Sequence, residues 1–157
     1  MPRSRRWGFT LVELVVVVII ISMVAAIAIP RLGGAMVRRR IEAAAQRVGA
    51  DLDLARRQAR LASQSRTVKF DAVQHRYTIE GISDPDRPGE AYVVDLTAEP
   101  YRARVLFVRF GLDNELVFDG FGNPDEESDV VLHIGNVTRR VVVTPANPQP
   151  RIEALTD

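Results

Sequence analysis

Apolar residues fill the stretch Phe9–Ile29, in which only Thr10, Glu13 and Ser22 are polar. As a helix this stretch spans about 32 Å at roughly 1.5 Å per residue, enough to cross the hydrocarbon core of a bilayer. Arginines precede the stretch and favour a cytoplasmic N-terminus, although arginines also flank its other end. The pattern therefore predicts a transmembrane helix over residues 9–30.

A secretory signal peptide is the alternative for the same stretch, with Ala26-Ile27-Ala28 as a small-x-small cleavage site. The apolar part of a signal peptide usually runs about 7 to 15 residues, and this run is longer. A carboxylate at the centre of a bilayer costs about 2.5 to 3.5 kcal/mol on insertion scales, so neither a signal peptide nor an ordinary anchor explains Glu13. Glu13 therefore indicates a specific partner inside the membrane.

The pattern of residues 31–65 predicts a second stretch of helix, which continues from the helix predicted over residues 9–30. Pro30 removes a backbone donor and clashes with the preceding turn, so we expect the helix to be weakened or bent there, whether it stays continuous, kinks or melts locally. Arginines of this part, such as Arg39, Arg47 and Arg57, lie off its apolar face and are expected to be solvated, or to meet acidic patches on neighbouring subunits. The apolar or small residues recur at alternating spacings of four and three, which predicts one stripe packed on a sheet: Ile41, Ala45, Val48, Leu52, Ala55, Ala59 and Ala62.

After Ser65 the pattern alternates with period two in short runs separated by turn signals such as SDPDRPGE and GFGNPDEES. Seven such runs after one long helix predict an α+β fold with antiparallel sheets over residues 66–157. The last run is RRVVVT. The segment that follows, TPANPQPRIEALTD, holds three prolines and is expected to form a tail or to cover a sheet edge.

Charge is uneven along the chain, although the net charge is only +1. From Arg31 to Lys69 there are ten basic residues against three acidic ones, and from Phe70 onward there are eight against sixteen. This acidic C-terminal half makes nucleic acid an unfavoured partner. The chain has no cysteine, which excludes disulfides and thiol catalysis.

No residue pattern points to an enzyme or to a cofactor. The chain has two histidines, His75 and His133. His133 has apolar neighbours in a predicted strand and is interpreted as a structural or surface residue rather than a catalytic one. The sequence holds no nucleophile elbow, phosphate loop or His-Glu metal motif. An acidic cluster is interpreted as a solvated turn rather than a calcium site, because its spacing does not match an EF-hand: Asp125, Glu126, Glu127 and Asp129.

The residues G-F-T-L-V-E, followed by an apolar helix and A-I-A-I-P, resemble the class III leader of type IV pilins and type II secretion pseudopilins. The resemblance implies that a prepilin peptidase cuts after Gly8, which makes residues 1–8 the leader, and that Phe9 is then N-methylated. Glu13 falls on the glutamate of the family's fifth mature position, and Pro30 on its helix-distorting proline. In the family this glutamate is thought to meet the N-terminal amine of a neighbouring subunit in the filament, where low dielectric strengthens the pair.

The C-terminal runs LVFDGFGNP, VVLHIG and RRVVVTP resemble the end of minor pseudopilins of the GspH/FimT type. The resemblance implies a structural, non-enzymatic subunit of a type II secretion pseudopilus, held in the bacterial inner membrane with its C-terminal domain in the periplasm. The implied partners are other pseudopilins or pilins, the prepilin peptidase and the inner-membrane assembly platform. The alternative is a FimT-like minor pilin for pilus assembly or DNA uptake; such proteins share a basic tail, and here the tail carries one arginine and two acids. A third hypothesis is a membrane-anchored or secreted enzyme. It is disfavoured because the sequence shows no recognisable set of catalytic residues.

Overall fold

The computed structural model describes residues 10–85, 87–110 and 114–155, without the side chains of 27–32. By internal contacts the chain divides into two units, residues 1–36 and residues 37–157. The first holds the N-terminal part of one helix, and the second holds the rest of that helix with every strand.

Helix α1 (Leu11–Ala62) has 52 residues and its backbone continues through Pro30. It ends three residues before the boundary expected from the sequence. Ser63 adopts a left-handed conformation with φ of 50°, and its N–H donates to the Arg60 carbonyl at 3.3 Å. The N–H of Gln64 donates to the Ala59 carbonyl at 3.1 Å, so carbonyls of the last turn are satisfied as in a helix C-cap.

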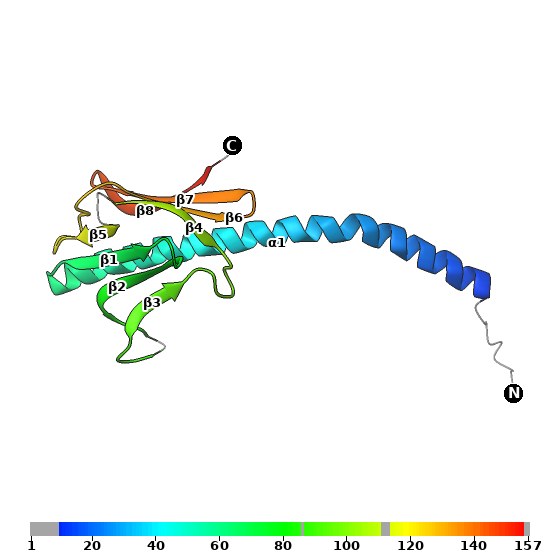
Figure 1. Cartoon of the computed structure of the whole chain (residues 1–157), viewed down its shortest axis with the longest axis horizontal. Coiled ribbons are helices and arrows are strands. Elements are labelled where there is room, and N and C mark those ends of the chain that lie inside the picture. The colour runs from blue at the N-terminus through cyan, green and yellow to red at the C-terminus, as the bar shows by residue number, and fades with distance from the viewer. Residues whose placement is uncertain (1–9, 86, 111–113, 156–157) are drawn as a thin grey trace, which may run out of the picture. The chain divides into compact units, whose positions relative to one another are not determined.

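The strands form two antiparallel sheets (Figure 1). Sheet A has the order β3-β2-β1-β5, and sheet B has the order β4-β6-β7-β8. This arrangement confirms the predicted α+β fold. The strands are β1 (Arg66–Asp71), β2 (Arg76–Ser83), β3 (Ala91–Asp95), β4 (Arg104–Phe110), β5 (Glu115–Phe118), β6 (Ser128–Ile134), β7 (Val137–Thr144) and β8 (Asn147–Leu155).

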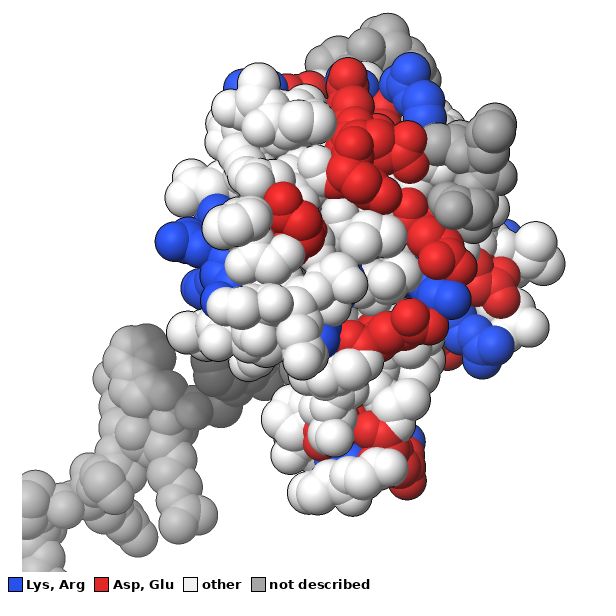
Figure 2. All heavy atoms as spheres, turned by 90° about the vertical axis from the view of Figure 1, so that its left-hand side faces the viewer, with Lys and Arg blue, Asp and Glu red and all other residues white. Residues whose placement is uncertain are grey.

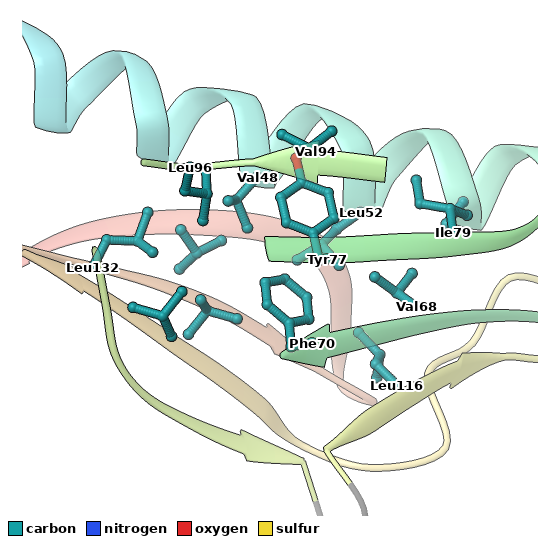
Figure 3. Close-up of a cluster of buried hydrophobic side chains, with 14 of the residues drawn as sticks. Val48, Leu52, Val68, Phe70, Tyr77, Ile79, Val94, Leu96, Leu116 and Leu132 are labelled. Carbon is teal, nitrogen blue, oxygen red and sulfur yellow. The ribbon is translucent and has the colours of Figure 1, made fainter. Parts of the chain in front are cut away.

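The predicted stripe of α1 is buried in a core that both sheets share (Figure 3). Ile41, Val48 and Leu52 of the stripe are at most 1% exposed, and Ala62 alone of the seven positions is exposed. The rings of Phe70 in sheet A and Phe110 in sheet B lie 5.2 Å apart, centre to centre. The helix and both sheets therefore depend on one another for burial of their apolar faces.

The segment expected to form a tail or to cover a sheet edge forms an eighth strand, so the tail was wrong, whereas the segment does lie at the edge of sheet B. Strand β8 pairs with β7 through positions such as Val141 opposite Ile152. Pro148 and Pro150 are tolerated because β8 is the edge of sheet B, where half of the backbone N–H groups need no partner strand. A Cβ at Gly49 of α1 would lie 3.7 Å from the Cβ of Pro150, so this edge also covers the helix.

The arginines off the stripe are not all solvated, which corrects a second expectation. The Nη2 of Arg47 donates to the Tyr92 hydroxyl at 2.7 Å, and its side chain is half-buried. Arg139 and Arg140 point to opposite faces of β7, as adjacent strand residues do. Arg139 pairs with Glu42 of α1 at 2.9 Å, and Arg140 pairs with Asp129 at 2.7 Å.

Candidate functional site

The start of helix α1 holds the site residues that the sequence singled out. Gly8 and Phe9, the expected cleavage and methylation positions, lie outside the described residues. Thr10 comes directly before the helix, and its hydroxyl oxygen accepts the N–H of Glu13 at 3.2 Å. The N–H of Leu14 donates to the Thr10 carbonyl at 3.2 Å. Thr10 is therefore an N-cap in a Thr-x-x-Glu arrangement, which sequence reasoning passed over although the spacing was visible.

Glu13 lies in the first helical turn with its side chain exposed. A carboxylate in this turn is stabilised by the positive end of the helix dipole. The local geometry thus gives Glu13 a role in starting the helix as well as leaving its charge available for a partner. Glu13 is the only charged residue between Leu11 and Ala26.

Large apolar side chains cover every side of the helix after Glu13. Leu14 is 60% exposed, Ile20 is 55% exposed and Met23 is 65% exposed. The hydroxyl of Ser22 donates to the Val18 carbonyl at 2.7 Å, so this polar group is satisfied within the helix. A helix that is apolar all round requires a cover of lipid or of other apolar helices.

Over the residues that the structure describes, no stretch of helix is both long enough and apolar enough to cross a membrane.

The family model for the prokaryotic N-terminal methylation motif matches residues 3–29. The match spans Gly8, Phe9 and Glu13 together with the exposed apolar helix. The chain thus carries a prepilin-type N-terminal motif at the start of its exposed apolar helix.

Two solved structures share this fold. The minor pseudopilin EpsH from the Type 2 Secretion System of Vibrio cholerae matches with a TM-score of 0.54 and 16% identity over 74% of this chain and 97% of that chain. The type IV minor pilin FimU of Pseudomonas aeruginosa strain PAO1 matches with a TM-score of 0.50 and 16% identity, over 76% of this chain and 90% of that chain. No curated protein matches the sequence significantly. Motif and fold together confirm the resemblance to minor pseudopilins of the GspH/FimT type.

The other candidate chemistry of the sequence is dispersed in the fold. Asp129 of the acidic cluster is buried against Arg109 and Arg140 at 2.8 and 2.7 Å. Asp125 instead accepts the N–H of Val117 at 3.1 Å. Within the described part of the chain, no three acidic or histidine side chains are grouped so that they could hold a metal ion. Burial opposes the charge of Asp129, but its hydrogen bonds to the two arginines outweigh it and lower its pKa.

A buried polar cluster that the sequence did not reveal joins α1 to sheet A. Asp51 is 5% exposed, and it accepts hydrogen bonds from the hydroxyls of Tyr77 and Tyr92 at 2.5 and 2.7 Å. The Nε of Arg47, one turn earlier, donates to the same carboxylate at 2.9 Å. The guanidinium also lies over the Tyr92 ring at 5.9 Å from its centre. We call these four residues the Asp51 cluster.

The Asp51 cluster shifts the proton affinities of its members. Burial, and then the adjacent Asp51 carboxylate, raise the pKa of Tyr77 well above its ordinary value. Burial and the hydrogen bond to Asp51 raise the pKa of Tyr92 in the same direction. Burial disfavours the charge on Arg47, but Asp51 outweighs it and raises the pKa of this guanidinium. Both hydroxyls therefore keep their protons and act as donors to the helix.

Proposed function

We propose that this chain is a minor pseudopilin of a type II secretion pseudopilus, cleaved after Gly8 and assembled through its N-terminal helix to support protein export. The main support for this proposal is the N-terminal helix. It begins at the Thr10 cap, contains one acidic residue, Glu13, and exposes apolar side chains on every side. Such a surface is stable in the membrane before assembly and against neighbouring apolar helices afterwards. The similarity to EpsH supports a place in a secretion system.

The proposal places the chain in the bacterial inner membrane, with residues 9–30 as the membrane and filament-core helix. Residues 31–65 then continue as the helix on which the sheets pack, and residues 66–157 form a periplasmic domain. Pro30 provides the helix kink. Prepilin peptidase, the assembly platform and other pseudopilins are the proposed partners, and the chain itself is structural rather than enzymatic.

A role in type IV pilus assembly is the second candidate, and the similarity to FimU favours it. Deletion of the gene separates the two. Loss of exported proteins with normal pili supports the pseudopilus, whereas loss of pili with normal export supports the minor pilin. DNA uptake is disfavoured because acidic residues outnumber basic ones from Phe70 onward.

Processing tests the proposal directly. Mass spectrometry of the membrane-extracted protein should find a mature chain that begins at Phe9 and carries one N-methyl group. Gly8→Val should leave the leader attached, since the larger side chain blocks the peptidase. A mature chain that begins at Ile29 would instead identify an ordinary signal peptide.

A further inference from the structure

A small cavity of about 430 Å³ opens on the second unit between the β1–β2 turn and the β3–β4 loop. We call it the basic notch, because the side chains that line it are neutral or basic: His75, Thr97, Arg102, Ala103 and Arg104. The β3–β4 loop lies at the end of the domain where α1 enters (Figure 1), and its Glu99 is 3.7 Å from Arg40 of the helix. Nothing in the proposed function uses these residues.

N–H donors dominate the basic notch. The Nδ1 of His75 accepts the N–H of Val105 at 3.2 Å, so the ring hydrogen of the neutral imidazole is on Nε2. The guanidinium of Arg104 makes no hydrogen bond or ion pair with another residue that the structure describes. The notch therefore has donors, one of them charged, that are available to an anion.

The carboxylates nearest to the basic notch are already engaged. Asp95 accepts the hydroxyl and the N–H of Thr97 at 2.6 and 2.7 Å. Glu99 pairs with Arg102 at 2.6 Å and with Arg40 at 3.7 Å, so two guanidinium groups share one carboxylate. The positive charge at this end of the domain is therefore not fully compensated.

Two further arginines extend the positive surface along α1. Arg38 and Arg39 directly precede Arg40 and are exposed, and neither makes an ion pair with a described residue. Arg38 follows Ile29, the end of the apolar stretch, by nine residues. Because the backbone of α1 is continuous, about 14 Å of helix at roughly 1.5 Å per residue separates the two. This length applies whatever the angle between the two units.

The other end of the domain has the opposite charge. Figure 2 views the domain from the side where α1 ends and shows acidic side chains across that face. The β5–β6 turn belongs to this end, since a Cβ at Gly120 would lie 3.0 Å from the backbone of Ser63, and it carries exposed acids such as Asp119 and Glu127. An anionic surface would attract the end with the basic notch and repel this one.

We propose that the basic notch, together with Arg38 and Arg39, binds the phosphate groups of anionic phospholipids before the subunit is assembled. The inference rests on the proposed function, because it needs the N-terminal helix to hold the chain in a bilayer. Guanidinium groups bind phosphate oxygens through paired N–H donors. A chain anchored nearby meets lipid phosphate at a high effective concentration. This contact holds the outer domain on the bilayer in one orientation until a filament takes up the chain.

The absence of native cysteine allows one fluorophore to be attached at a chosen position of the full mature chain. Ala98→Cys places it on the exposed β3–β4 loop beside the notch, and Phe121→Cys places it on the β5–β6 turn, where the native side chain is 83% exposed. Each labelled protein is reconstituted in vesicles of phosphatidylcholine, with or without phosphatidylglycerol, that carry a quencher on the lipid headgroups. Phosphatidylglycerol should increase the quenching of the label at position 98 and leave that at position 121 unchanged.

Removing charge then shows whether the arginines hold the contact. Arg38→Gln with Arg104→Gln should lower the ratio of docked to undocked domain about tenfold, since each arginine near an anionic bilayer contributes about fivefold. Arg57→Gln with Arg87→Gln is the matched control, because it removes the same charge from side chains that are 59% and 60% exposed and lie away from the notch. This control should leave the ratio nearly unchanged.

The source of the phosphate is tested in the vesicles without phosphatidylglycerol, to which inorganic phosphate and a short DNA duplex are added separately. A label at position 98 that responds to either additive, and is not quenched further by phosphatidylglycerol, would identify a free anion or nucleic acid as the ligand and overturn lipid binding.

Insertion is read from the same vesicles by flotation after an alkaline wash. Protein that resists the wash, but whose quenching is the same with both lipids or is unaffected by the loss of Arg38 and Arg104, overturns the lipid contact and leaves the proposed function standing. Protein that the wash extracts from the vesicles overturns both.

Discussion

At the scale of single residues, Asp51 connects parts of the chain that lie far apart in the sequence. Its carboxylate receives hydroxyls from residues 26 and 41 positions later, on two different strands. A buried carboxylate is costly unless its oxygens are satisfied, and here three donors satisfy it. The Asp51 cluster thereby fixes the position of α1 along sheet A.

Asp51→Ala should lower the free energy of unfolding of the full chain by about 3 kcal/mol, because it leaves two buried hydroxyls and a half-buried guanidinium without their acceptor. Chemical denaturation in a mild detergent, followed by circular dichroism, measures the change. Asp53→Ala is the control on the same helix; its pairs with Arg56 and Arg57 are more exposed, so the cost should stay at about 1 kcal/mol or less. Equal losses in the two variants would contradict the role of the Asp51 cluster.

Alkaline pH gives a second readout of the same cluster. The folded state raises the pKa of Tyr77 and Tyr92, so it holds their protons more tightly than the unfolded chain does. Their contribution to stability is therefore complete below the ordinary tyrosine pKa of about 10 and is lost as the pH rises further. Tyr77→Phe with Tyr92→Phe should remove most of this alkaline loss.

At the scale of elements, the stripe of α1 is the feature that the sequence predicted best. The apolar positions recur at spacings that alternate between three and four residues. This spacing is a local property of the helix and does not depend on what the helix packs against. Leu52 on this stripe is 1% exposed, and Leu61 off it is 81% exposed. The same helix therefore offers a buried and an exposed leucine for comparison.

Leu52→Asp should lower the free energy of unfolding by about 3 to 5 kcal/mol, since it removes core packing and buries a carboxylate. Leu61→Asp makes the same chemical change in solvent and should cost about 1 kcal/mol or less. Thermal melting of both variants beside the unmodified chain checks the difference. A Leu52→Asp variant that melts with the parent would mean that the helix does not pack on these sheets.

Features built from distant parts of the chain escaped prediction. Strand β8 was missed because its two prolines are breakers in a local pattern, and only its place at the sheet edge makes them acceptable. The Asp51 cluster was missed because a single aspartate in a helix carries no signal of tyrosines on β2 and β3.

At the scale of the whole molecule, Glu13 lies outside the folded domain, and we propose that it acts in assembly. It lies in the first unit, where its apolar neighbours are exposed, and the core of the second unit does not include it. Substitutions at Glu13 should therefore act on filament formation and leave the stability of the second unit unchanged.

Glu13→Ala should reduce incorporation into the filament while cleavage after Gly8 continues, because only the proposed partner of the Phe9 amine is lost. Glu13→Lys should be more severe, since it sets two cations against each other where the dielectric constant is low. Glu13→Asp, which keeps the charge with a shorter reach, should be intermediate. Crosslinking to neighbouring subunits with a parallel cleavage assay separates the two steps, and normal crosslinking of Glu13→Lys would refute the pairing.

The arrangement of helix and strands also has a mechanical consequence. Strands β1 and β7 run along the second half of α1 rather than across it (Figure 1). A force that pulls the helix lengthwise out of its domain would load the apolar stripe and the Asp51 cluster in shear, so their contacts would resist together instead of opening one after another. In the proposed filament, a force applied along this part of α1 would therefore load these contacts together.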